Sequence, residues 1–246
     1  MSVAMRVISV LALIFLILGI AYSGELKGDE FEKSTLNKAW IWASPDKDGK
    51  WSLTDKPGWL SITCPAGDHD MWDFRGGAPM MTAKAPKDDY IIETHLQISE
   101  WPANSYAGIH FLGKDALNDE KSPGPWGHLI LCCGAPGSDL RWQNSVAVDG
   151  AQVGLTGEEI YMKIEKKGDE FDSFYKSKEN ENWQSVGKGS VDMGSEHYIC
   201  LGACNWGGTG AVTVEFDYFR SEPPIIMADV SPASKLANTW ASIKKQ

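Results

Sequence analysis

The chain has 246 residues, of which 43% are hydrophobic and 11% aromatic, enough for one domain with a substantial apolar core. Its 33 acidic and 23 basic residues give a formal net charge of −10, and such an acidic surface repels phosphate backbones and anionic lipid. We therefore expect no nucleic-acid partner and no membrane-surface role, whereas a neutral ligand such as a sugar is compatible with this charge.

The first 23 residues have the pattern of a secretory signal peptide. Arg6 supplies a short positive region, Val7–Ile20 is mostly apolar, and small residues at Ala21 and Ser23 precede the expected cleavage site. The apolar run is shorter than the roughly 20 residues that a membrane-spanning helix needs. We therefore expect a secreted or cell-envelope protein whose mature chain has no membrane span, with residues 24–222 as its folded domain.

The next informative region is rich in tryptophan and turns at Pro57–Gly58. Aromatic and apolar residues flank this turn, which predicts a β-hairpin with strands at Trp51–Thr54 and Trp59–Cys64. Tryptophans in a segment that defines a fold usually pack inward, so core positions are expected for Trp40, Trp42, Trp51 and Trp59.

Three later segments alternate apolar and polar residues with the period of a half-buried strand. They are Asp89–Ser99, Glu159–Lys166 and Ala211–Arg220. In the last segment, Val212, Val214, Phe216 and Tyr218 are expected to share one face. Gly- and Pro-rich turns separate such segments, and no long helical period occurs between residues 24 and 220. The predicted fold class is all-β, an antiparallel β-sandwich or jelly roll.

Five cysteines allow either one disulfide or buried thiols. In an exported protein, a bridge would most naturally join the pair Cys132 and Cys133 to the pair Cys200 and Cys204, leaving Cys64 among the unpaired thiols. A cysteine-based zinc site is a poor alternative, because no CxxC repeat is present and the histidines are scattered. Both the disulfide and the thiol interpretations stay open.

The chain changes character at residues 223–246. Pro223 and Pro224 stop the last predicted strand and begin a linker. Beyond them, residues 231–246 could form a short amphipathic helix that docks on the domain or engages another protein.

The order and spacing of several motifs resemble one known family. They begin at Asp29–Phe31 and continue through Trp51–Thr54, Pro57–Leu60, Tyr106–His110 and Phe216–Phe219. This pattern is similar to the C-terminal concanavalin A-like domain of family-43 glycoside hydrolases, the β-xylosidase type, and to related stand-alone bacterial modules. The resemblance covers roughly residues 27–220 and implies a concanavalin A-like jelly roll.

The resemblance also bears on function. In enzymes of that family the hydrolytic carboxylates lie on a separate propeller domain, for which this chain has no room. The resemblance therefore implies a detached, lectin-like accessory module that binds a polysaccharide or oligosaccharide without catalysis.

Two alternatives remain: a protein-interaction module, and a glycoside hydrolase, because sandwich glucanases exist. Retaining hydrolysis needs two carboxyl groups roughly 5 Å apart, which a strand supplies at alternate positions. Within the three predicted strands, only Glu215 and Asp217 are alternate acids on one face, and no third acid accompanies them. No nucleophile elbow, phosphate loop or dinucleotide fingerprint is present either.

A sugar site combines an aromatic face with nearby hydrogen-bonding side chains. Residues beside turns, together with Arg141 and Gln143, which would share a face of a concave sheet, are the best candidates. The predicted carbohydrate-binding residues are Trp72, Arg75, His110, Trp126, Arg141, Gln143 and Trp206. No cofactor is required, but a structural calcium between the first and last strands would use Asp29 and Asp217 as oxygen ligands.

Overall fold

Sixteen β-strands make up the computed structural model, which describes residues 27–70, 77–114, 124–132, 139–146, 151–155 and 157–226. These residues contain no α-helix, and none of their segments is a helix long and apolar enough to cross a membrane. The predicted signal peptide and the tail at residues 231–246 lie outside the described residues.

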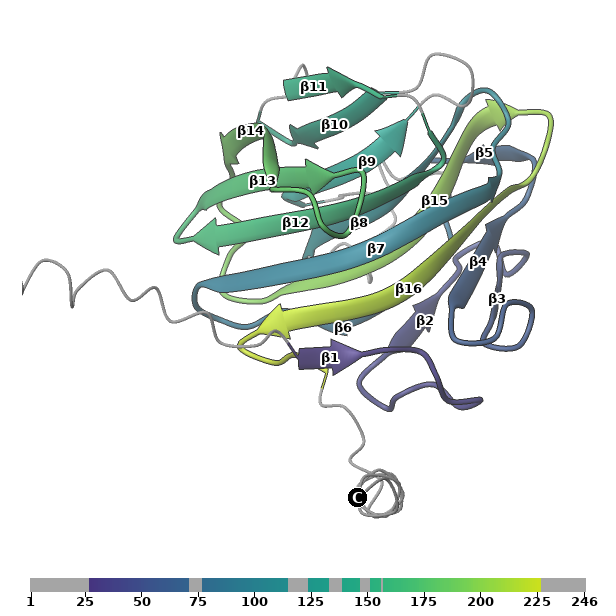
Figure 1. Cartoon of the computed structure of the whole chain (residues 1–246), viewed down its shortest axis with the longest axis horizontal. Helices are drawn as coiled ribbons and strands as arrows, with labels where there is room; N and C mark the ends of the chain where they lie inside the picture. Colours follow the sequence, from purple (N-terminus) through teal and green to yellow (C-terminus); the bar gives the residue numbers. More distant parts are fainter. Residues whose placement is uncertain are drawn as a thin grey trace, which may run out of the picture.

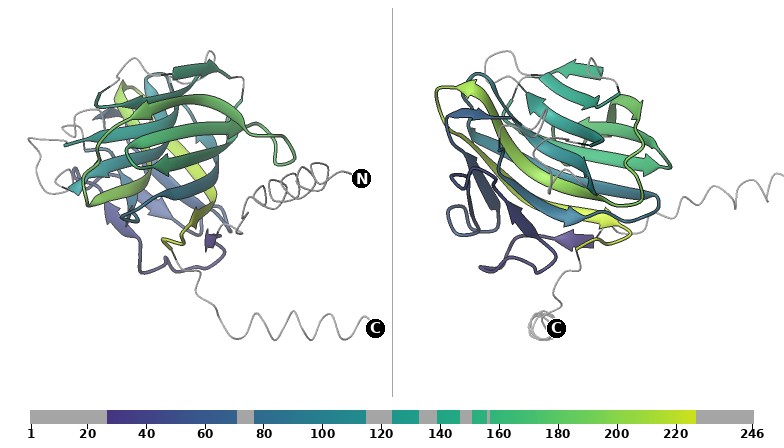
Figure 2. Two further views of the ribbon diagram at one scale, coloured as in Figure 1. Left: turned by 90° about the vertical axis from the view of Figure 1, so that its left-hand side faces the viewer. Right: turned by 180° about the vertical axis from the view of Figure 1, so that it is seen from behind.

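Two antiparallel sheets lie face to face (Figures 1 and 2). Sheet I has the order β14-β13-β12-β7-β16-β4-β3, with β1 also paired to β16. Its strands are β1 (Lys27–Asp29), β3 (Lys50–Ser52), β4 (Leu60–Cys64), β7 (Tyr90–Glu100), β12 (Glu159–Lys167), β13 (Glu170–Lys176), β14 (Gln184–Ser190) and β16 (Val212–Glu222).

Sheet II has the order β11-β10-β9-β8-β15-β6-β2, with β5 also paired to β15. Its strands are β2 (Ile41–Ala43), β5 (Gly67–His69), β6 (Met80–Lys84), β8 (Ser105–Gly113), β9 (Trp126–Cys132), β10 (Asp139–Asn144), β11 (Ala151–Gly154) and β15 (His197–Gly208). The all-β antiparallel sandwich predicted from the sequence is confirmed.

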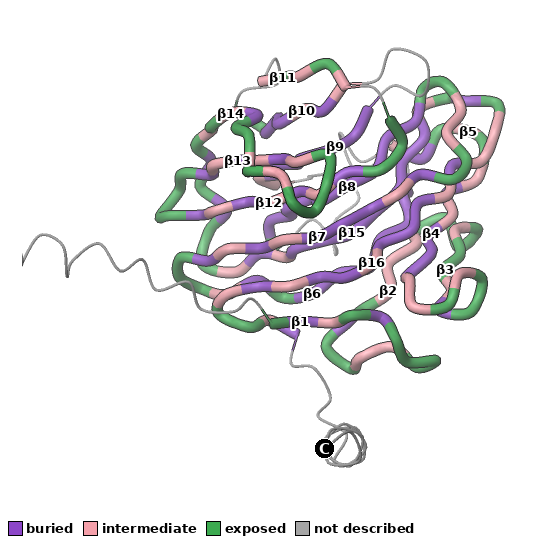
Figure 3. Tube along the Cα trace, in the orientation of Figure 1, coloured by how far each residue is buried: buried purple, intermediate pink, exposed green. Residues whose placement is uncertain are grey.

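The main core lies between the two sheets and follows the predicted alternation. On β7, Ile92, Leu96 and Ile98 are fully buried, and on β12 the same holds for Met162 and Ile164. Burying one such side chain stabilises the fold by roughly 1.5–3 kcal/mol. The outward residues of these strands are mostly polar and half-buried, and Figure 3 shows the mixture of buried and half-buried positions along β7 and β12.

The predicted alternation of β16 fails after Phe216. The pairing of β16 with β7 shifts register between Phe216 and Tyr218, as in a β-bulge. As a result Phe219 lies in the core in place of Tyr218, whose hydroxyl donates a hydrogen bond to Glu93 at 2.6 Å. The expectation that Tyr218 continues the buried face was therefore wrong, because one extra residue at the bulge reverses the side of every residue after it.

The predicted hairpin is present as β3 paired with β4, but its tryptophans divide. Trp40 is buried against Phe219, whereas Trp51 is 38% exposed because β3 is the last strand of sheet I. Trp59 lies outside the core and contacts His95 at 5.2 Å between ring centroids. Inward packing was therefore predicted correctly for Trp40 and wrongly for Trp51 and Trp59, while Trp42 is partly buried against the core.

Sheet II differs from sheet I in that its central strands are buried on both faces. Every residue of β8 and β9 is buried. The outward residues of sheet II form a second apolar cluster, which includes Met80, Tyr106, Leu112, Trp126, Ile130, Cys132, Cys200 and Cys204. Figure 3 shows the continuous buried stretches along β8, β9 and β15. The outer face of sheet II has no partner sheet and yet is largely buried, so we expect a ligand site on this face.

The four cysteines that the structure describes are buried thiols. No disulfide links the four described cysteines, which are Cys64, Cys132, Cys200 and Cys204. The predicted bridge from Cys132 to Cys200 or Cys204 is therefore not formed, because strand pairing separates these positions; Cys204 and Cys132 both lie opposite Tyr106, on its two sides. Cys133 lies outside the described residues.

Candidate functional site

Four neighbouring strands carry a row of polar side chains across the outer face of sheet II. Strand register places Cys200 opposite His110, His110 opposite His128, and His128 opposite Gln143. Directly paired residues of antiparallel strands point to the same side, so these four side chains share one face. A glycine supports the close spacing: a Cβ on Gly108 would overlap the carbonyl oxygen of Leu129 on β9.

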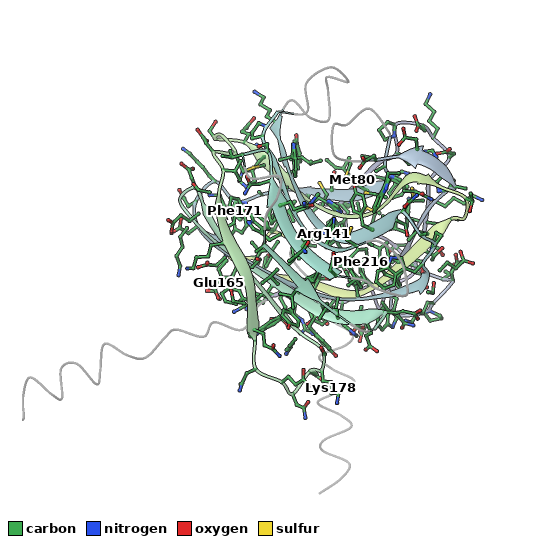
Figure 4. The ribbon with its side chains drawn as sticks, turned by 90° about the horizontal axis from the view of Figure 1, so that it is seen from above. Met80, Arg141, Glu165, Phe171, Lys178 and Phe216 are labelled. Atoms are coloured by element: carbon green, nitrogen blue, oxygen red, sulfur yellow. The ribbon has the colours of Figure 1, made fainter. Side chains whose placement is uncertain are left out.

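Beside this row lies a pocket of about 320 Å³, near the lower end of the roughly 300–1,000 Å³ range of small-molecule sites. Strands β8, β9, β10 and β15 and the residue after β5 form its wall. Figure 4 labels Arg141, which comes from β10. The lining residues are Asp70, Tyr106, His128, Ile130, Cys132, Arg141, Gln143 and Trp206.

An ion pair fixes the cationic group of the pocket. The Arg141 guanidinium donates from Nε to Asp139 Oδ1 at 2.6 Å and from Nη2 to Oδ2 at 2.8 Å. The Arg141 side chain is 28% exposed and that of Asp139 is 17% exposed. A bidentate pair in this partly buried position holds the planar guanidinium in one orientation at the pocket wall.

Two aromatic rings form another part of the wall. The rings of Tyr106 and Trp206 have centroids 5.5 Å apart and planes tilted by 38°. The Tyr106 hydroxyl donates a short hydrogen bond to Asp70 Oδ1, which fixes the carboxylate beside the rings. Tyr106 is buried, whereas Trp206 is only partly buried and presents surface at the rim.

His128 links the floor of the pocket to Gln143. Its Nε2 lies 3.1 Å from Gln143 Oε1, so the imidazole donates and the amide oxygen accepts. Burial lowers the pKa of His128 to about 4, although the hydrogen bond to Gln143 and the charge of Asp70 oppose the shift. His128 is therefore a neutral donor at neutral pH. Burial, with the neighbouring His128, likewise holds the pKa of His110 well below its usual value.

The structure brings together three of the predicted site residues: Arg141, Gln143 and Trp206 all line the pocket. His110 and Trp126 lie beside it on the same sheet face, in ring contact with His128 at centroid distances of 5.6 and 5.2 Å. Both are buried and neither lines the cavity, so their predicted direct contact with a ligand is not supported by their placement. Trp72 and Arg75 lie outside the described residues.

Three polar lining residues were missed from the sequence: Asp70, Tyr106 and His128. Alternation could have found two of them, because Tyr106 shares a strand face with His110, and His128 shares one with Trp126. Asp70 carried no such signal, since it follows a three-residue strand.

The predicted calcium ligands have separate partners. Asp29 accepts hydrogen bonds from the Phe31 backbone N–H and from Trp40 Nε1, whereas Asp217 Oδ2 lies 3.0 Å from His95 Nδ1. Calcium at Asp29 and Asp217 stays a prediction, to be tested by whether a chelator lowers the melting temperature.

The positions of the carboxylates decide whether the pocket has the pair of acids that glycoside hydrolysis needs. Asp70 is the only carboxylate among the described residues that line the pocket, and Asp139 beside it is paired with Arg141. Glu215 and Asp217, the alternate acids of the sequence, belong to β16 in sheet I rather than to the pocket's sheet.

Comparison with known proteins places this architecture in a family. Residues 28–222 match the model of the β-xylosidase C-terminal concanavalin A-like domain. The chain belongs to this family. No curated protein gives a significant sequence match to the chain.

Two solved structures share the fold of this concanavalin A-like domain at low sequence identity. The GH43 protein BlXynB of Bacillus licheniformis is 18% identical with a TM-score of 0.60, over 80% of this chain and 39% of that one. The xylan β-1,4-xylosidase of Bacillus halodurans is 17% identical with a TM-score of 0.61, over 81% and 40%. This chain therefore spans about two fifths of the length of these relatives.

A third structure has the proportions of the sandwich alone. LamAcat of Zobellia galactanivorans is 15% identical with a TM-score of 0.54, and the match covers 82% of this chain and 99% of that one. At such identities the likeness concerns the fold.

Proposed function

We propose that this concanavalin A-like domain is an exported, non-catalytic carbohydrate-binding module whose site is the pocket on the outer face of sheet II. The observation that carries the proposal is the meeting of an aromatic wall, Tyr106 and Trp206, with the hydrogen-bonding groups of Asp70, Arg141 and Gln143 around one cavity.

The chemistry of these groups suits a sugar. A pyranose offers a CH-rich face, which stacks on an aromatic ring, and a rim of hydroxyls, each able to donate and accept. Arg141 and Gln143 bring N–H groups to the wall, and Asp70 brings a carboxylate that accepts. Their orientation is fixed before binding by Asp139, His128 and Tyr106, which lowers the entropy cost of association.

The acids favour binding over hydrolysis. Both retaining and inverting glycosidases use a pair of carboxyl groups that flank the bond to be cleaved. The described lining of the pocket offers Asp70 as its one carboxylate. The nearby Asp139 is engaged by Arg141, which holds its charge in an ion pair.

A panel of oligosaccharides tests the proposal, beginning with xylo-oligosaccharides because a relative is described as a xylan β-1,4-xylosidase. We expect retention on immobilised glycan without new reducing ends, and loss of retention in Trp206→Ala. Trp183→Ala is the matched control, because this half-buried tryptophan contacts Lys163 and Lys176 of sheet I. New reducing ends would identify a hydrolase, and absence of retention on every glycan would refute the proposal.

Export rests on the sequence of residues 1–23, whose charged start, apolar run and small residues fit a signal peptide. Expression with and without these residues, followed by fractionation, tests it: we expect the full chain outside the cytoplasm and the shortened chain inside.

A further inference from the structure

Away from the pocket, one imidazole lies between two carboxylates. His69, the last residue of β5, has a side chain that is only 10% exposed. Its Nδ1 lies 3.0 Å from Asp46 Oδ2, a hydrogen-bond distance. Its Nε2 lies 3.7 Å from Asp48 Oδ2, which is too long for a hydrogen bond. The two aspartates come from the loop between β2 and β3 and are half exposed, so ions can reach them.

A second histidine of the same molecule provides the comparison. His95 also lies between two carboxylates, with Nδ1 3.0 Å from Asp217 and Nε2 2.9 Å from Glu159. Both distances are those of direct hydrogen bonds, so His95 contacts a carboxylate oxygen at each ring nitrogen. At His69 only the Nδ1 contact has a hydrogen-bond distance. The 3.7 Å between His69 Nε2 and Asp48 Oδ2 is too long for a hydrogen bond and leaves room for an ion between the two atoms.

The gap has the size of a metal-ligand pair. Two ligand atoms that lie about 2.1 Å from one ion at a tetrahedral angle are about 3.4 Å apart, close to the 3.7 Å between His69 Nε2 and Asp48 Oδ2. One ligand atom from each of Asp46, Asp48 and His69 lies within 4.8 Å of the others. With Nδ1 donating to Asp46, the Nε2 lone pair points toward the Asp48 carboxylate, so two acceptors face one point.

We propose that His69 Nε2 and the Asp48 carboxylate bind a divalent cation of the zinc class, with Asp46 as the positioning residue that fixes the imidazole. Imidazole nitrogen suits zinc and its transition-metal neighbours, whereas calcium and magnesium prefer sites made only of oxygen. A carboxylate that accepts from the other ring nitrogen is the usual support of such a ligand, and Asp46 has this place.

The surroundings fit this assignment. A Cβ on Gly77 would overlap the Asp46 carboxylate, so Asp46 is held against the backbone of a third segment. The buried Cys64 has its Sγ 3.7 Å from the Pro65 carbonyl oxygen and is not among the three residues whose ligand atoms gather here. His69 is followed directly by Asp70, so a bound ion would anchor the residue before one that lines the pocket.

Titration of chelator-treated, full-length protein with zinc by calorimetry tests the site. We expect one equivalent of zinc to bind, and to bind more tightly than calcium or magnesium. Asp48→Asn and His69→Gln should each weaken zinc binding by at least about tenfold, because each removes a ligand. Asp46→Asn should weaken it less and shift the nitrogen NMR signals of His69. Glu159→Gln, which makes the same change beside His95, is the matched control and should bind zinc like the parent protein.

Three results would overturn the proposal: no zinc binding, zinc binding unchanged in Asp48→Asn, or a stronger preference for calcium. Asp48 is exposed, so its asparagine variant is expected to fold, and its circular dichroism spectrum checks this. Histidine NMR adds an independent readout, since a metal-free protein with protons on both nitrogens of His69 at neutral pH would identify a plain ion pair. None of these measurements depends on glycan binding.

Discussion

Asp139 and Arg141 lie two positions apart on β10 and form a two-pronged ion pair along the wall of the pocket. Because the side chains of a strand alternate in direction, these two lie on one face, where both carboxylate oxygens accept hydrogen bonds from the guanidinium. Arg141 is thus both a ligand group of the proposed sugar site and a group held in place by its neighbour.

The pair predicts different effects for its two members. Arg141→Ala should abolish retention on glycan, because it removes a contact group from the cavity. Asp139→Asn should weaken affinity by about tenfold, because a neutral amide holds the guanidinium less firmly. Calorimetric titration with the best glycan measures both. Equal loss in the two variants would mean that Asp139 itself contacts the sugar.

Tryptophans on the two sides of the domain predict opposite effects on stability. Trp126 is 7% exposed and packs against His128, so Trp126→Ala should destabilise the fold by about 3–5 kcal/mol. Trp51 is 38% exposed on an edge strand, so Trp51→Ala should cost less than about 1 kcal/mol. Urea unfolding compares them. A small cost at Trp126 would show that its burial contributes little.

The buried histidine of the pocket predicts a dependence of stability on pH. Burial lowers the pKa of His128 to about 4, against about 6.5 in an unfolded chain. The unfolded state therefore binds the proton first, and the stability that neutral His128 contributes is present above about pH 6.5 and lost as the pH falls toward 4, by at most about 3 kcal/mol.

His128→Gln should therefore make the free energy of unfolding less sensitive to acid in this range than it is in the parent protein. His197, whose pKa is also lowered to about 4 by burial and then by Lys166, supplies a remaining slope in both proteins. Urea unfolding between neutral pH and about pH 5 gives the two slopes. Identical slopes would contradict the assignment to His128.

The Asp70 hydrogen bond predicts a role for the Tyr106 hydroxyl. Tyr106→Phe keeps the ring beside Trp206 but removes one hydrogen bond to the Asp70 carboxylate, so glycan affinity should fall by several-fold while the fold is retained. Titration of Tyr106→Phe beside Trp206→Ala separates the two contributions. An unchanged affinity in Tyr106→Phe would assign Asp70 a purely structural part.

Local patterns in the sequence predicted what depends on neighbours along the chain. The alternation on β7 and β12 gave the core face correctly, and the same rule placed Arg141 and Gln143 together. It failed at the bulge before Tyr218, because an extra residue leaves no mark in a polar and apolar pattern.

The features that could not be predicted from the sequence depend on the order of the strands in each sheet. His110 was chosen from its motif, but its neighbours Cys200 and His128 on the flanking strands help to bury it, and it does not line the cavity. Asp48 and His69 are 21 positions apart and meet only because β5 pairs with β15 while the loop before β3 folds across. Such meetings follow from pairings of distant segments, which a single sequence does not state.

The pairing of β1 with the end of β16 has a consequence for how the domain can be attached to another polypeptide. Gly28 lies opposite Arg220, so both ends of the sandwich leave from one margin, and Figures 1 and 2 show this margin on the opposite side of the molecule from β10 and β11. A domain whose two ends leave from one margin can be fused to the end of another chain or inserted into it without a change in the strand order of either sheet. Arg141 and Gln143, which belong to β10, then lie on the side of the domain away from the attached chain.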